Sequence, residues 1–205
     1  MAKRRRKRAS PPRARQVFLN IPYSRSYERL MVALTTAVIV TEAEPMLTFK
    51  LVEVGEGRLR RIMQALAASQ ISIHDLSYGH CRPARFNMPF ELGLAYAERY
   101  RTGDHEVHVL EARPYRLQRT LSDLNGIDPK IHHRKPARAI HAVLGITRRP
   151  DGNPSTAKVL ALFERVWRKL VPQLRADFSE DLFERELYEE LCVGIRLEAF
   201  LAGLI

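Results

Sequence analysis

Two kinds of hydrophobic pattern alternate along residues 17–147. Short runs of β-branched and apolar residues, typical of buried strands, are each followed by a longer stretch with the three- and four-residue spacing of a helix. The strand-like runs are residues 17–21, 46–52, 71–75, 106–111 and 130–132. The helix-like stretches are residues 26–40, 57–69, 88–100, 115–124 and 136–147. Five such repeats predict an α/β fold with a five-stranded parallel sheet and helices on both faces.

The pattern changes after residue 147. Residues 148–156, RRPDGNPST, interrupt any regular element, and only helical spacing follows them. One apolar stripe consists of Leu160, Phe163, Trp167 and Leu170, and a second of Phe183, Leu187, Leu191 and Ile195. Pro172 is expected to end the first of these two helices, because proline lacks the N–H group that a helix interior needs.

The chain is therefore expected to have four parts. These are a disordered basic tail (1–16), a flavodoxin-like three-layer α/β domain (17–147), a linker (148–156) and a C-terminal helical extension (157–205). The almost wholly apolar residues 199–205 must dock on the α/β body or on another chain, since such a strip is rarely left uncovered. We therefore expect a homo-oligomer formed through the C-terminal helices.

A net charge of +11 first suggests nucleic acid as a partner. Residues 1–15, however, hold eight Lys and Arg and no acid, so the rest of the chain carries only +3. A tail of this kind binds phosphate backbones without sequence readout, through counterion release. Two alternatives stay open for it: non-specific association with nucleic acid, or a solubilising role.

The cysteines and the longest apolar run indicate the compartment. Cys81 and Cys192 lie far apart and make no CxxC pair, which favours a reducing cytoplasm. The longest apolar run, residues 30–40, covers 11 residues, whereas about 20 are needed to span a bilayer. A cytoplasmic protein without a membrane anchor is expected.

Polar residues follow the predicted strands, at the edge where open parallel sheets bind ligands. They are Asn20, Tyr23 and Ser24 after the first strand, Asp75 and Ser77 at the end of the third, and Arg113 after the fourth. We expect them to line a ligand site. Arg113, together with Arg85, favours a ligand that carries phosphate, because arginine pairs with phosphate oxygens in bidentate fashion.

Glu91 is the strongest candidate for chemistry. Asn87 and Pro89 mark the start of the helix, Asn87 as its N-cap, so Glu91 falls near the first turn, where the helix dipole favours an anion. Gly93 weakens that helix and suggests the close approach of a ligand or a backbone. The plain alternative is that Glu91 merely suits a helix N-terminus and that the arginines are solvated.

Several segments together resemble a known family. FNMPFELGLAYAERY resembles the helix of nucleoside 2-deoxyribosyltransferases that carries their reactive glutamate. With VFLNIPYSRSYERLMVAL, ISIHDLS and ARPYRLQRTLSDLNGIDPKIHH, it looks like a group of bacterial proteins similar to deoxyribosyltransferase-like and Toll/interleukin-receptor (TIR)-like α/β domains, some linked to antiphage defence. The resemblance covers about residues 17–147. It does not extend to the turn PARFN before the helix.

The resemblance implies an enzyme acting on an N-glycosidic bond. Glu91 would attack, or stabilise electrostatically, the anomeric carbon as the bond breaks. Asp75 would assist by binding ribose hydroxyls or protonating the leaving base, and the loop after the first strand would hold the nucleoside or nucleotide. Hydrolysis, deoxyribosyl transfer and NAD hydrolysis all remain open, and so does a module of the same fold that senses a nucleotide without turnover.

Other chemistries find no matching pattern. His74, His80 and Cys81 lack the spacing of a zinc site, so no metal is expected. The chain contains no G-x-S-x-G, G-x-G-x-x-G or G-x-x-x-x-G-K-[ST] motif. No cofactor is therefore expected.

Overall fold

The chain folds around a five-stranded, wholly parallel sheet, which confirms the predicted fold class. The computed structural model describes residues 15–50, 57–78, 86–124, 126–178 and 181–205. The strands are β1 (Arg15–Asn20), β2 (Ala43–Met46), β3 (Ile71–Asp75), β4 (Glu106–Glu111) and β5 (Lys130–Ile131). Their order, β2-β1-β3-β4-β5, is that of flavodoxin-like folds.

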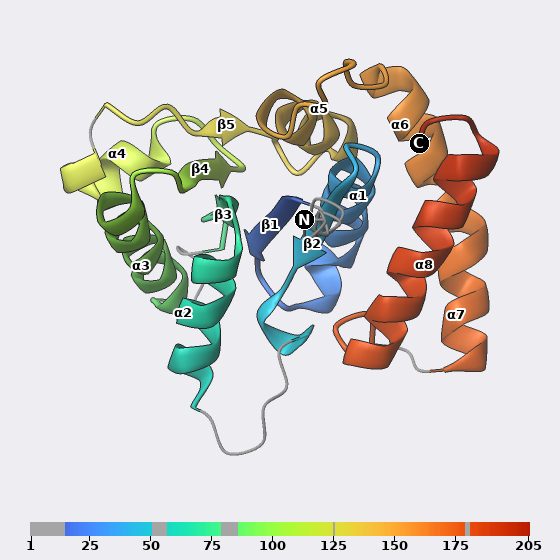
Figure 1. The fold of residues 1–205 in the computed structure, drawn as a ribbon, viewed down its shortest axis with the longest axis horizontal. Helices are drawn as coiled ribbons and strands as arrows, with labels where there is room; N and C mark the ends of the chain where they lie inside the picture. Colours follow the sequence, from blue (N-terminus) through green and yellow to red (C-terminus); the bar gives the residue numbers. More distant parts are fainter. Residues whose placement is uncertain (1–14, 51–56, 79–85, 125, 179–180) are drawn as a thin grey trace, which may run out of the picture.

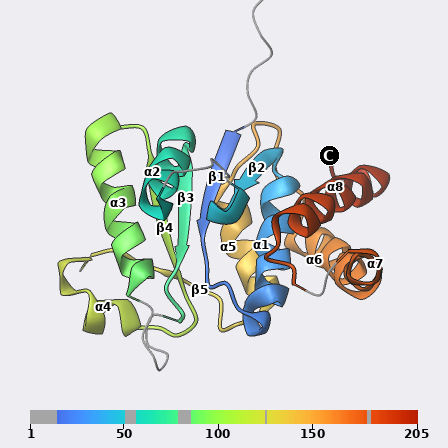
Figure 2. The ribbon, with the colours of Figure 1, turned by 90° about the horizontal axis from the view of Figure 1, so that it is seen from below.

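Helices cover both faces of the sheet (Figure 1). Those of the α/β body are α1 (Glu28–Ile39), α2 (Arg58–Ala68), α3 (Asn87–Thr102), α4 (Arg116–Thr120) and α5 (Pro136–Ile146). The C-terminal ones are α6 (Thr156–Arg165), α7 (Val171–Asp177) and α8 (Arg185–Leu201). Helices α2 and α3 lie on one face and α1 and α5 on the other, and α6, α7 and α8 form a further layer outside α1 (Figure 2).

The strands β3 and β4 have the predicted bounds, but the second strand does not. It covers Ala43–Met46 instead of residues 46–52, and the short 3₁₀ helix η2 (Thr48–Lys50) follows it. Pro45 lies inside this strand and cannot donate to a ladder. The strand tolerates it because β2 is at the edge of the sheet and pairs only with β1.

Helix α1 is apolar nearly all round because it is buried on all sides. Of its 12 residues, only Arg29 is not buried. The sheet and α5 cover one side, and α6 and α8 cover the other, where Thr35 hydrogen-bonds the Tyr188 hydroxyl at 2.9 Å. The C-terminal helices therefore share one continuous hydrophobic core with the α/β body.

Two helices differ from their predicted extent. Pro172 does not end the first C-terminal helix, which runs on from α6 into α7 through a π turn, η4 (Val166–Leu170). There the Val171 N–H donates to the Val166 carbonyl, five residues back, and the wider turn accommodates the proline. The predicted helix 115–124 is split at Leu121 into α4 and the 3₁₀ turn η3 (Ser122–Leu124).

Within the described ranges, no helix is long and apolar enough to cross a membrane. The basic residues 1–14 lie outside those ranges, so the expected nucleic-acid contact of the tail stays a prediction.

A buried ion pair joins the C-terminal layer to the start of α1. Arg175 Nη2 donates to Glu28 Oε2 at 2.6 Å, and the Glu28 side chain is only 4% exposed. Replacing Arg175 by Met should lower the free energy of unfolding by about 2–3 kcal/mol, because a buried carboxylate loses its cation. Urea unfolding measures the loss.

The matched control is Arg185→Met, which removes an exposed pair with Glu189. It should cost less than about 1 kcal/mol. Equal losses in the two variants would show that the Glu28–Arg175 pair does not hold the layers together.

Candidate functional site

The strand order creates a crevice between β1 and β3. From β1 the chain moves to β2 on one side, and from β3 it moves through β4 to β5 on the other. At such a topological switch point the connections diverge, and open α/β sheets bind their ligands just outside the carboxyl ends of the strands there. The loop after β1 and the start of α3 flank this crevice.

A polar cavity of about 320 Å³ occupies this position. Its walls are the loop after β1 and the first turns of α2 and α3. The lining residues are Asn20, Ile21, Pro22, Tyr23, Arg58, Asn87, Met88 and Glu91. Four of the predicted site residues, Asn20, Tyr23, Asn87 and Glu91, are thus brought together.

Glu91 is almost fully buried in the wall of this cavity, and its side chain is 4% exposed. Arg58 Nη2 donates to its Oε1 at 3.3 Å. Burial raises the pKa of Glu91 above its ordinary value, although the charge of Arg58 and hydrogen bonds from Asn87 and Arg58 act in the opposite direction. The site therefore holds a carboxylate that is poorly solvated and balanced by one half-exposed cation.

Asn87 does not cap α3. It is the first helical residue, and its side chain bonds Glu91 one turn later instead. No backbone segment of the described residues packs closely on Gly93, because no protein atom lies within 4 Å of the position that a Cβ would take there.

Asn20 fixes the start of α3 against β1. Its Nδ2 donates to the Met88 carbonyl at 3.2 Å and to His74 Nδ1 at 3.0 Å. Burial lowers the pKa of His74 to about 3, with smaller contributions from His105 and His108, so the ring is neutral. Asn20 thus positions the helix that carries Glu91.

Tyr23 forms a rigid wall of the cavity. Its ring packs against Phe49 and Phe183, with both ring centroids at 5.3 Å, and its hydroxyl lies 2.7 Å from Thr48 Oγ1. Burial raises the pKa of Tyr23 to about 12, although hydrogen bonds to Thr48 lower it and nearby Glu91 raises it further. The hydroxyl therefore remains neutral.

Asp75 does not line the cavity that holds Glu91. It lies in a separate buried cluster on the α1 and α5 side of the sheet, where four hydrogen bonds reach its carboxylate. The donors are the Tyr27 hydroxyl, the Ser77 backbone N–H, the Ser77 hydroxyl and His132 Nε2, the last at 3.0 Å. Asp75 was expected to line the ligand site together with Glu91, but the two carboxylates do not line the same cavity.

The tautomer of His132 follows from its second nitrogen. His132 Nδ1 accepts the Arg134 backbone N–H at 3.0 Å, so the proton is on Nε2, which points at Asp75. Burial raises the pKa of Asp75, but the hydrogen bonds from His132, Ser77 and Tyr27 outweigh it, and the pKa lies below the ordinary value. Asp75 is an ionised acceptor with its lone pairs occupied.

The remaining predicted residues lie elsewhere. Ser77 is a donor to Asp75, and Ser24 lines a neighbouring cavity of about 270 Å³ that shares Tyr23 with the first. Arg113 is exposed, and its backbone N–H donates to Glu111. Arg85 lies outside the described residues.

Sequence reasoning missed Arg58, Tyr27 and Glu111. A signal for Arg58 was present: it directly follows Gly57 at the start of a predicted helix, and helices that follow parallel strands begin near the ligand edge of the sheet. Glu111 ends β4, and burial raises its pKa despite hydrogen bonds from the backbone N–H groups of Ala112 and Arg113 and the charge of Arg116. No signal distinguished Tyr27 from the other core residues of its helix.

Among the described residues, no group of three or more His, Cys, Asp or Glu is arranged to hold a metal ion. Comparison of the chain with protein-family models, with curated proteins and with solved structures gives no match. The resemblance to deoxyribosyltransferase-like and TIR-like domains therefore stays a prediction, and the interpretation of the site rests on its geometry.

The Asp75 cluster predicts a pH-dependent loss of stability on Asp75→Asn. Because the folded-state pKa is lowered, ionised Asp75 stabilises the fold above its unfolded pKa, and this contribution is lost as pH falls through the folded pKa. At pH 7 the free energy of unfolding of the variant should be lower by about 2–3 kcal/mol, because the new amide NH₂ group faces hydrogen-bond donors instead of acceptors. Urea unfolding between pH 7 and acid pH should show the difference narrowing.

Asp123→Asn makes the same chemical change at an exposed position and serves as the control. A loss for Asp75→Asn that does not change with pH would contradict an ionised Asp75.

Proposed function

We propose that the chain binds a small nucleoside or nucleotide in the cavity between β1 and α3, and that Glu91 acts on the N-glycosidic bond of this ligand. The observation that carries the proposal is one buried carboxylate in the wall of a polar cavity at the topological switch point. Its volume of about 320 Å³ lies at the lower end of the range for small-molecule sites. The wide spacing of the cysteines supports a cytoplasmic location for this activity.

The chemistry of the lining residues fits a sugar. Carboxylate and amide groups hydrogen-bond hydroxyls, and Glu91, Asn20 and Asn87 supply both kinds. An anion beside the anomeric carbon stabilises the positive charge that develops there as the bond to the base breaks. Glu91 attacks this carbon, and the bonding electrons leave with the base. Water or a second base then releases the sugar from the glutamyl ester.

Arg58 gives the site its preference for an anionic ligand. It is the one cation among the described residues that line the cavity, and its side chain is 57% exposed. A phosphate group draws it away from Glu91, because guanidinium pairs with phosphate oxygens in bidentate fashion.

Asp75 is not part of the proposed chemistry. Its four hydrogen bonds leave no lone pair for a ligand, and it supports the loop after β1 instead. The proposal differs in this from the resemblance, which assigns Asp75 to the sugar or the base. The group that accepts the sugar from Glu91 is water or a second nucleobase.

Release of a free base tests the activity. Purified protein is incubated with NAD, with nucleosides and with nucleotides, and the products are separated by chromatography. Glu91→Gln should lower the rate by roughly 100-fold or more while nucleotide binding, measured by calorimetry, persists. The control Glu106→Gln neutralises an exposed carboxylate on β4 and should not change the rate.

Binding of a nucleotide without release of any base by the wild type would reject the enzyme and leave a non-catalytic binding module. Equal rates for the wild type and Glu91→Gln would remove Glu91 from the mechanism.

The pH dependence of kcat/KM tests the role of Arg58. Because the Arg58 charge lowers the pKa of Glu91, Arg58→Met should raise that pKa further. The acid limb of the profile then moves to higher pH, since Glu91 acts in its ionised form. Arg58→Lys keeps the charge and should move the limb less, and an unchanged limb in Arg58→Met would contradict the assignment of this limb to Glu91.

A further inference from the structure

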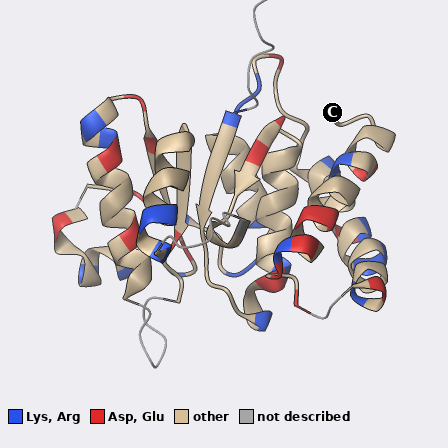
Figure 3. Ribbon diagram, turned by 60° about the horizontal axis from the view of Figure 1, so that its bottom comes forward, with Lys and Arg blue, Asp and Glu red and all other residues tan. Residues whose placement is uncertain are grey.

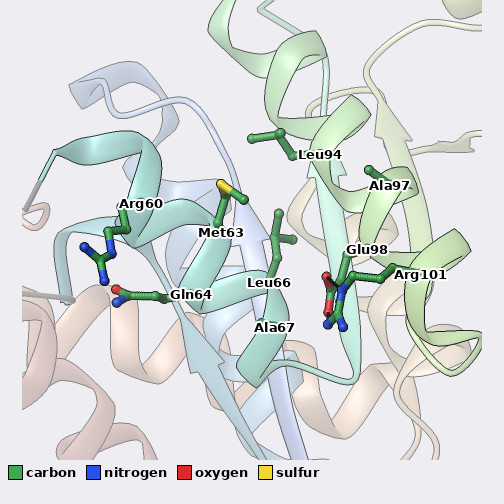
Figure 4. A pocket seen from close by; sticks show the side chains of 9 residues that line it. All are labelled: Arg60, Met63, Gln64, Leu66, Ala67, Leu94, Ala97, Glu98 and Arg101. Atoms are coloured by element: carbon green, nitrogen blue, oxygen red, sulfur yellow. Dashed lines mark hydrogen bonds and ion pairs between the residues drawn. The ribbon is translucent and has the colours of Figure 1, made fainter.

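An apolar groove runs between α2 and α3 on the outer side of the α/β body. We call it the α2–α3 groove, and its volume is about 400 Å³. Figure 4 shows its lining side chains: Arg60, Met63, Gln64, Leu66 and Ala67 from α2, and Leu94, Ala97, Glu98 and Arg101 from α3. Ala67 and Ala97 are small and exposed, so a bulky side chain can approach between the helices.

A second apolar surface lies on the outer face of α8. We call it the α8 stripe, and it consists of Val193, Leu197, Phe200 and Leu201. Each of these side chains is more than half exposed, from 58% to 70%. They recur at helical spacing on one face, which is the pattern of a helix that inserts into a groove.

The charges of the two surfaces are complementary. The charged residues that line the α2–α3 groove are two arginines, Arg60 and Arg101, and one glutamate, Glu98, whereas α8 carries four glutamates and two arginines (Figure 3). Glu186 and Glu190 continue the line of the α8 stripe toward the N-terminus of α8 and are exposed. The acidic end of the α8 stripe thus complements a groove whose lining carries a net positive charge.

We infer that the α8 stripe of one chain docks into the α2–α3 groove of a second copy. The two surfaces lie on opposite sides of the molecule, so a chain cannot fill its own groove (Figures 1 and 2). Contact between two different surfaces is heterologous, and each pair leaves one groove and one stripe available for further copies. Assembly therefore proceeds beyond the dimer.

The experiment uses one variant for each surface. Leu197→Asp places a charge in the α8 stripe, and Met63→Glu places one in the α2–α3 groove. Both residues are more than half exposed, at 58% and 53%, so the fold should tolerate the changes. Light scattering coupled to size-exclusion chromatography should show wild-type assemblies that grow with concentration, and only monomer for each variant alone.

A mixture of the two variants is the decisive arm. Leu197→Asp keeps an intact groove and Met63→Glu keeps an intact stripe, so an equimolar mixture should form a dimer and nothing larger. Tyr115→Asp, at an exposed aromatic residue outside both surfaces, should assemble as the wild type does.

Three outcomes overturn the inference. They are a wild type that stays monomeric at high concentration, a Met63→Glu variant that assembles normally, and a variant mixture that stays monomeric. The second outcome, combined with loss of assembly in Leu197→Asp, would indicate pairing of α8 with α8 instead.

Discussion

The Asp75 carboxylate accepts hydrogen bonds from three segments that are far apart in the sequence. Tyr27 follows β1, Ser77 follows β3, and His132 follows β5. A buried carboxylate destabilises the fold unless hydrogen-bond donors surround it. If any of these segments moved away, the Asp75 charge would lose a donor inside the protein. This requirement fixes the carboxyl edge of the sheet, including Asn20 at the end of β1 and Tyr23 in the loop after it.

The pleat of β3 divides this edge into two environments. His74 and Asp75 are adjacent and therefore point to opposite faces. His74 joins Asn20, which holds the start of α3, whereas Asp75 joins the cluster against α1 and α5. The cavity with Glu91 therefore lies on one face of the sheet, and the hydrogen-bonded Asp75 cluster lies on the other. This cluster holds the strand ends in place, and a binding site needs such support to keep its geometry.

The sequence predicted the fold better than it predicted the site. The strands β3 and β4 are buried apolar runs with clear limits, so the hydrophobic pattern located them. Strand β2 was misplaced because Pro45 argues against a strand. A proline is tolerated only in an edge strand, and the sequence does not show which strand is at the edge. Asn20 and Tyr23 were predicted because they follow the first strand, and Asn87 and Glu91 because they mark the start of a helix. The sequence predicted neither the place of Arg58 in the cavity nor the separation of Asp75 from Glu91. Both depend on which face of the sheet each helix covers, and this is decided by tertiary packing.

The candidate site and the α2–α3 groove are formed by the same two helices. Arg58 lies two residues before Arg60 on α2, and Glu91 lies one turn before Leu94 on α3. The spacing of α2 and α3 sets the width of the groove, because both helices line it. That spacing also sets the 3.3 Å contact between Arg58 and Glu91. Because the Arg58 charge opposes the effect of burial on the pKa of Glu91, the relative placement of α2 and α3 matters for the candidate site as well as for the groove.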